Sequence, residues 1–144
     1  MDLALDEARK AARRGEVPVG AVIIDSRLEV IAATSNRCVE LNDPMAHAEM
    51  LALRLLQQAY PEERYFPNHS MWVTLEPCSL CASAILALRL NRLVFGAYDP
   101  KGGAIDHGPR LFEQPTTHWR PDVIGGIRET EASTLLRQFF EARR

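Results

Sequence analysis

Cysteine is scarce in this sequence, and long apolar segments are absent from it. The chain has three cysteines among its 144 residues, and no apolar run is long enough to cross a bilayer. The first residues include Asp2, Asp6 and Lys10, which are not typical of the apolar core of a secretory signal. We therefore expect a cytoplasmic protein with no membrane partner, in which a disulfide framework is not expected.

The chain also lacks an excess of positive charge. It has 17 lysines and arginines against 19 aspartates and glutamates, for a formal net charge of -2. Proteins that bind long stretches of phosphate backbone are usually basic overall, so any nucleic-acid contact would have to be local. Arginines do gather at the C-terminus, in Arg137, Arg143 and Arg144. They form either such a local patch or the solvated end of a helix, where cations are also favourable.

Helical and strand patterns alternate along the sequence, whose length and 47% hydrophobic content suit one globular domain over residues 1–144. The expected helices cover about residues 2–14, 44–59, 78–90 and 131–143. The expected strands cover residues 19–25, 29–33, 71–75, 92–97 and 122–127, of which the first two predict a hairpin. Residues 98–121 are rich in Gly and Pro and predict a loop with one helical turn near Leu111. This order predicts an α/β fold, a three-layer α/β/α sandwich with a mixed central sheet of about five strands.

Two short segments carry the residues best suited to chemistry. His47-Ala48-Glu49 supplies an imidazole and a carboxylate, and Cys78 and Cys81 supply two thiols one helical turn apart. One imidazole and two thiols are three ligands for zinc, and a site with three protein ligands keeps a position open for water. Glu49 is then free to move protons. The combination predicts hydrolytic chemistry on a small polar substrate.

The spacing of these residues constrains where a metal can lie. Cys78 and Cys81 share one face of the expected helix, whose N-terminus also favours thiolates. His47 and Glu49 are two residues apart and would point to opposite sides of a regular helix, so they cannot share a site on its flank. We expect instead a site off the N-terminal ends of two helices, with Asn42, Asp43 and Pro44 as start signals of the second helix of the chain.

Each segment alone has other interpretations. A single Cys-x-x-Cys is also half of a structural zinc site or a redox pair. A structural site needs a fourth protein ligand, and the spare candidates (Cys38, His69, His107 and His118) have no ligand-like spacing. Cys38 is interpreted as a buried small side chain. The two segments together favour a catalytic zinc ion.

The two segments also resemble a known signature. His47-Ala48-Glu49, followed by Thr-Leu-Glu-Pro-Cys-Ser-Leu-Cys at residues 74–81, resembles the zinc-dependent nucleoside and nucleobase deaminase superfamily. Within it, the sequence is similar to the bacterial tRNA-specific adenosine deaminases over nearly its whole length. The supporting segments are residues 16–22, 36–37, 95–104 and 135–140, together with His118.

The resemblance implies a fold, a reaction and partners. The fold would be cytidine deaminase-like, with one Zn²⁺ per subunit and a homodimeric assembly. The reaction would be hydrolytic deamination of the wobble adenosine to inosine in a tRNA anticodon stem-loop. Zinc would be held by His47, Cys78 and Cys81, and Glu49 would act as base and then as acid.

Substrate contacts are implied by resemblance alone. Asn36 matches a position that hydrogen-bonds the target base, and Asp99 and Lys101 match a loop that touches flanking nucleotides. Of the pair Phe139 and Phe140, one would be core and the other, Phe140, would contact a splayed base. In the alternative without substrate contacts, Asn36 is a turn residue, Asp99 and Lys101 belong to an exposed charged loop, and both phenylalanines pack in the core.

Two rival functions remain open. A deaminase of free guanine, cytosine or cytidine would use the same zinc centre. A non-catalytic zinc-stabilised binding module would need a closed tetrahedral site, which three ligands beside an unused Glu49 fit poorly.

Overall fold

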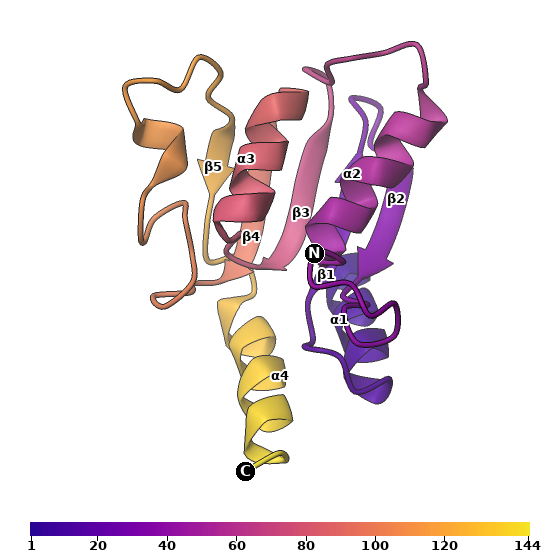
Figure 1. Ribbon diagram of the computed structural model, residues 1–144, viewed down its shortest axis with the longest axis vertical. Coiled ribbons are helices and arrows are strands. Elements are labelled where there is room, and N and C mark those ends of the chain that lie inside the picture. The colour runs from indigo at the N-terminus through magenta and orange to yellow at the C-terminus, as the bar shows by residue number, and fades with distance from the viewer.

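A five-stranded sheet runs through the centre of the protein, in the order β2-β1-β3-β4-β5 (Figure 1). The computed structural model describes residues 1–144. The strands are β1 Gly20–Ile24, β2 Val30–Ser35, β3 Ser70–Leu75, β4 Arg92–Ala97 and β5 Asp122–Ile124. β1 pairs antiparallel with β2 and β3, whereas β4 pairs parallel with β3 and β5. The predicted mixed sheet and its N-terminal hairpin are therefore confirmed.

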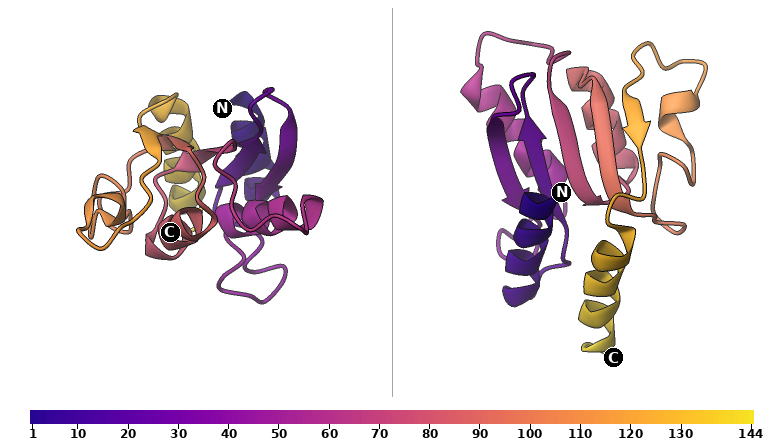
Figure 2. Two further views of the ribbon diagram at one scale, coloured as in Figure 1. Left: turned by 90° about the horizontal axis from the view of Figure 1, so that it is seen from above. Right: turned by 180° about the vertical axis from the view of Figure 1, so that it is seen from behind.

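Helices cover both faces of the sheet. They are α1 Asp2–Arg13, α2 Ala48–Ala59, α3 Ser79–Leu88 and α4 Glu129–Glu141, with one turn of 3₁₀-helix, η1, at Leu111–Glu113. Seen from above, α2 and α3 lie on one side of the sheet and α1 and α4 on the other (Figure 2, left). The predicted three-layer sandwich is confirmed, and so is the helical turn inside the long loop. None of the helices is long and apolar enough to cross a membrane.

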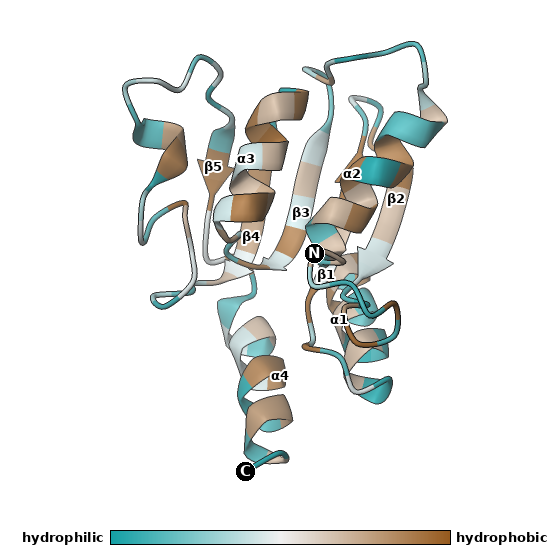
Figure 3. Cartoon of the chain, in the orientation of Figure 1, coloured by the Kyte–Doolittle hydropathy of each residue, from teal (hydrophilic) through white to brown (hydrophobic).

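The main core lies between the sheet and the pair α2 and α3. Alternate residues of the strands, such as Ile23, Val73 and Phe95, point into it and meet Leu53 and Ile85 of the helices. Figure 3 shows α2 and α4 each with a hydrophobic and a hydrophilic side, as expected of helices that cover a sheet. The core thus fixes the positions of α2 and α3, and with them their N-terminal ends.

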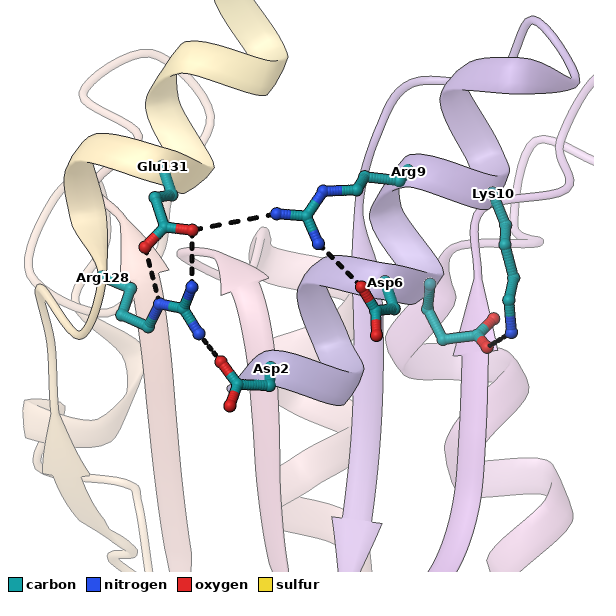
Figure 4. A network of polar contacts seen from close by, with 7 residues as sticks. Asp2, Asp6, Arg9, Lys10, Arg128 and Glu131 are labelled. Carbon is teal, nitrogen blue, oxygen red and sulfur yellow. Dashed lines mark hydrogen bonds and ion pairs between the residues drawn. The ribbon is translucent and has the colours of Figure 1, made fainter.

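The opposite layer is held by close packing and by ion pairs. Gly20 of β1 lets α1 approach, because a Cβ there would lie 2.0 Å from the carbonyl oxygen of Ala4. At the surface, Arg128 at the start of α4 pairs with Asp2 and with Glu131, and Glu131 also meets Arg9 at 3.8 Å (Figure 4). These exposed pairs join α1 to α4 and contribute little stability individually.

Several predicted boundaries were wrong. α2 begins at Ala48 and not near Pro44, because the residues before it form a turn. In this turn the Asp43 carboxylate accepts the Met45 N–H at 2.8 Å, and Asn42 has a φ of +48°. An aspartate that bonds its own backbone two residues on favours a turn over a helix start.

The C-terminal boundaries moved for similar local reasons. β5 ends at Ile124 and not at residue 127, since Gly126 takes a φ of +81°. α3 ends at Leu88, with Arg89 in the left-handed region at a φ of +56°. α4 begins two residues before the expected start, at Glu129, and ends two residues early at Glu141.

Candidate metal centre and active site

Two helix N-termini converge on one cluster of ligands. His47 is the N-cap residue of α2, with an extended backbone (φ -66°, ψ 149°), and Cys78 is the N-cap residue of α3. Cys81 lies in the first turn of α3. Because His47 stands outside the helix and Glu49 inside its first turn, their spacing no longer prevents them from sharing a site. The predicted arrangement of two helix ends is confirmed.

The separation of the ligand atoms fits zinc. His47 Nδ1 lies 3.6 Å from Cys78 Sγ and 3.5 Å from Cys81 Sγ, and all three atoms are within 4.8 Å of one another. Tetrahedral zinc with ordinary bond lengths places its nitrogen and sulfur ligands about 3.6 Å apart. The imidazole nitrogen therefore already lies at the spacing of zinc ligands from both thiols.

No fourth protein ligand joins this cluster. The group holds His47, Cys78 and Cys81 alone. Among the spare candidates, His107 bonds Glu76, and Cys38 is half-buried, not buried as expected, with its thiol 3.9 Å from the carbonyl of Pro44. A three-ligand donor set suits a catalytic zinc ion better than a structural one.

The hydrogen bonds of the cluster favour negative charge on the sulfur of Cys78. Its hydrogen bond with Cys81 lowers the pKa of Cys78 to about 4, against the effect of burial, and His47 adds to this. The same bond, together with burial, raises the pKa of the Cys81 thiol well above its usual range. The hydrogen bond with Cys78 raises the pKa of His47, although burial opposes this. A thiolate beside an imidazole at two helix N-termini is a site prepared for a cation.

Glu49 lies beside this cluster and away from water. Its side chain is on the first turn of α2, and the residue is 4% exposed. Burial is the main reason that the pKa of Glu49 is raised to about 7; the nearby Cys78 contributes to the rise, while a backbone hydrogen bond and His47 oppose it. A buried carboxyl with a pKa near neutrality can both accept and donate a proton at physiological pH.

The peptide units between His47 and Glu49 are held on both sides. The Ala48 N–H donates to Asn36 Oδ1 at 2.7 Å, and the Ala48 carbonyl accepts from the Thr34 hydroxyl at 2.7 Å. Asn36 follows β2, and Thr34 lies within it. β2 therefore fixes the backbone that orients the imidazole relative to the carboxylate. Sequence reasoning missed Thr34, because nothing in the local pattern indicates its partner.

The side-chain NH₂ group of Asn36 has no hydrogen-bond partner within the chain. It is 9% exposed, and its Oδ1 is occupied by Ala48, whereas its NH₂ donates no hydrogen bond within the chain. The structure thus places this predicted substrate residue next to the cluster through Ala48, with a donor to spare.

The loop that carries Asp99 and Lys101 also reaches the cluster. Cys78 and Gly103 form an isolated antiparallel bridge, which brings this loop against the second helix N-terminus. Asp99 Oδ1 accepts the N–H groups of Lys101 (3.2 Å) and Gly102 (3.0 Å), so that oxygen shapes the turn. The Lys101 side chain is exposed and forms no ion pair.

Of the two phenylalanines of α4, one is buried and the other exposed, as predicted. Their helix does not contact either of the helices that carry the metal ligands. Phe139 is 8% exposed and lies under the Arg143 guanidinium, 3.5 Å from its ring centroid, whereas Phe140 is 49% exposed. α4 packs on β3, β4 and α1 and not on α2 or α3. It projects beyond the end of the sheet at which α2 and α3 begin (Figures 1 and 2). The last turn of α4, to which Phe140 belongs, therefore lies beyond that end of the sheet.

Sequence reasoning also missed Glu76, which is 1% exposed and accepts several hydrogen bonds from the loop after β4. Burial would raise the pKa of Glu76, but the hydrogen bonds from Asp99 and His107 outweigh it and lower the pKa. A glutamate before Pro-Cys was visible in the sequence. Its partners lie more than twenty residues away, and no spacing rule connects them.

Known proteins share both the sequence and the fold. Residues 1–97 match the cytidine and deoxycytidylate deaminase zinc-binding region. A tRNA-specific adenosine deaminase of Agrobacterium fabrum is 52% identical over 100% of this chain and 93% of its own length. A tRNA-specific adenosine deaminase of Haemophilus influenzae is 42% identical over 100% of this chain and 83% of its own length.

Solved structures agree. One from a study of A-to-I editing by tRNA:A34 deaminases at the wobble position of transfer RNA has a TM-score of 0.90 and 50% identity, over 94% of this chain and 97% of that one. A guanine deaminase from Nitrosomonas europaea has the same fold, with a TM-score of 0.74 and 24% identity over 96% of this chain and 81% of that one. The chain therefore belongs to the zinc-binding cytidine and deoxycytidylate deaminase family, and within it to the tRNA-specific adenosine deaminases.

Proposed function

We propose that this protein converts the wobble adenosine of a tRNA anticodon loop to inosine by hydrolysis, with release of ammonia. The observation that carries this proposal is the open cluster of three ligands beside a buried carboxyl. Similarity over the whole chain to tRNA-specific adenosine deaminases supports the choice of substrate. The guanine deaminase with the same fold supports no competing substrate, because its likeness is limited to the fold.

In this proposal, zinc is held by His47 Nδ1 and the two thiolates of Cys78 and Cys81. When bound there, the metal supplies a Lewis acid that lowers the pKa of water at its open position. The helix N-termini that carry His47 and Cys78 stabilise the thiolates, and Thr34 and Asn36 orient the imidazole through Ala48.

Glu49 moves the protons of the reaction. Its carboxylate accepts a proton from the attacking water and delivers it to the ring nitrogen beside C6 of the adenine. Glu49 then accepts the proton of the hydroxyl group now on C6 and passes it to the amino group, so that the C6–N bond breaks, ammonia leaves and the C6 carbonyl of inosine forms. One carboxyl can serve in both directions because burial brings its pKa close to 7.

The remaining contacts select the substrate. The free NH₂ of Asn36 donates to the target base, and Asp99 and Lys101 contact nucleotides that flank it. The exposed Phe140 stacks on a splayed base, as aromatic side chains do in single-stranded RNA recognition. These contacts suit a short RNA loop and do not require a basic surface over the whole protein.

We further propose a cytoplasmic homodimer. The cytoplasmic location follows from the substrate, because tRNA is found there. The dimer is supported by the exposed apolar side chains of Val39, Leu41, Met45 and Leu55, which lie before and on α2.

Deamination assays test the proposed function. Zinc-loaded protein is incubated with an anticodon stem-loop that has adenosine at the wobble position, and separately with free adenosine, cytidine, cytosine and guanine. We expect inosine and ammonia from the stem-loop alone. Glu49→Gln is expected to keep zinc and the fold but to lose at least about 100-fold in turnover, the usual contribution of a general acid or base. Full activity of the zinc-loaded variant would exclude the proposed role of Glu49.

A further inference from the structure

The buried carboxylate of Glu76 forms hydrogen bonds with both ends of the loop that follows β4. Glu76 Oε1 accepts the backbone N–H groups of Ile105 (3.2 Å), Asp106 (2.9 Å) and His107 (3.0 Å). Its Oε2 accepts the N–H of Asp99 at 2.9 Å and meets His107 Nδ1 at 2.8 Å. Five hydrogen bonds on one side chain tie both ends of residues 99–107 to one point. We call this segment the Glu76 loop.

His107 is the only side chain among these partners. An ionised carboxylate only accepts hydrogen bonds, so Nδ1 of His107 carries the proton and donates it to Glu76. The imidazole also packs edge-on against Tyr98, with ring centroids 6.0 Å apart, and its side chain is 35% exposed. The far end of the loop is therefore held by both its backbone and a side chain.

The same carboxylate lies next to the segment that supplies the metal ligand. The Ala104 N–H donates to the Pro77 carbonyl at 2.9 Å, and Gly103 bridges to Cys78. A Cβ at Gly103 would lie 2.5 Å from Cδ of Glu76, so the loop passes directly over the carboxylate. Glu76 is thus enclosed between the Cys78 segment and the loop that carries Asp99 and Lys101.

We propose that Glu76, assisted by His107, is a positioning residue that fixes the loop with Asp99 and Lys101 relative to the metal centre. In this way it determines how tightly the enzyme binds the nucleotides beside the target base. It acts through the loop and contacts neither the target base nor the metal. The inference rests on the proposed function, because these two residues grip nucleotides only if the substrate is an RNA loop. Loss of this anchoring weakens binding of the stem-loop and leaves proton transfer at Glu49 nearly intact.

Substitutions of Glu76 and His107 test this role. Glu76→Gln replaces one acceptor oxygen by an NH₂ group that faces N–H donors. His107→Leu removes the side-chain donor without touching the Cys78 segment, and His107→Asn restores a donor close to the position of Nδ1. Zinc content, steady-state kinetics on the stem-loop, and hydrogen exchange of the backbone amides of residues 99–107 are measured for each variant.

We expect Glu76→Gln and His107→Leu to raise KM about tenfold or more, as loss of a hydrogen bond to a charged group does, with a much smaller change in kcat. Amides of the Glu76 loop should exchange faster in both variants, and His107→Asn should restore most of KM and protection. If Glu76→Gln loses zinc, the contrast between His107→Leu and His107→Asn decides the test.

Unchanged KM and unchanged exchange in zinc-loaded His107→Leu would overturn the inference, and so would an equal loss in His107→Leu and His107→Asn. A fall in kcat at constant KM would also overturn it, because Glu76 would then act on the chemical step. Failure of the proposed function looks different. The unaltered protein would then make no inosine from the stem-loop, while hydrogen exchange would still report whether Glu76 anchors the loop.

Discussion

Asn36 has two separable tasks, and substitution can divide them. Its Oδ1 accepts the buried N–H of Ala48 at 2.7 Å, at the start of α2, while its NH₂ is free. Asn36→Ala leaves that N–H without a partner, which costs about 1 to 3 kcal/mol of unfolding free energy. For 144 residues the entropy of unfolding is about 0.3 kcal/mol per kelvin. We therefore expect the melting temperature to fall by about 3 to 10 °C.

The assay is thermal unfolding of zinc-saturated protein, followed by circular dichroism. Asn68→Ala is the matched control, because Asn68 is exposed and its side chain forms no hydrogen bond within the chain. Asn36→Asp keeps the acceptor and places a negative charge at a helix N-terminus, so its melting temperature should stay closer to that of the unaltered protein. It loses the NH₂ donor, so its activity should fall as far as that of Asn36→Ala. Equal melting temperatures for Asn36→Ala and Asn68→Ala would refute the structural role of Asn36.

Two further predictions concern the ligands and the Glu76 loop. Cys81→Ser is expected to remove zinc and abolish inosine formation, and chelation of the unaltered protein should do the same reversibly. Zinc content is measured by elemental analysis and activity by inosine formation. Activity retained without metal would exclude a catalytic zinc ion. Gly103→Ala should lower kcat/KM on the stem-loop because its Cβ would lie 2.5 Å from Cδ of Glu76, whereas Gly102→Ala, whose Cβ would meet only the side-chain end of Asp99 at 3.0 Å, should be tolerated. Equal kinetics for the two alanine variants would contradict the proposed path of the loop over Glu76.

The chemistry of the site could be predicted from the sequence because it is local. His47 and Glu49 are two residues apart, and Cys78 and Cys81 three, so their neighbours and helix ends constrain them. The convergence of two helix ends could be predicted from helix geometry, since the side chains of residues two apart cannot face the same side of a regular helix. Most of the sheet was also predictable, because β1, β3 and β4 are short runs rich in apolar residues that the core buries.

The parts that were missed depend on contacts between distant segments. Asp43 and Pro44 were interpreted as a helix start, but the Asp43 side chain bonds the Met45 N–H and makes a turn. The true start of α2 is stabilised by Asn36, twelve residues before Ala48. The hydrogen-bond partners of Glu76 could not be predicted from its neighbours either, since they come from residues 99–107, after another helix and strand.

Site-resolved inosine formation tests most directly whether this centre edits a wobble adenosine. Zinc-loaded protein is presented under single-turnover conditions with two anticodon stem-loops of equal composition. One has adenosine at the wobble position, and the other has it one position away, with Glu49→Gln as the inactive reference. We predict rapid conversion of the wobble adenosine and no conversion of the displaced one. Equal conversion of both, or conversion of free nucleosides alone, would contradict the proposal.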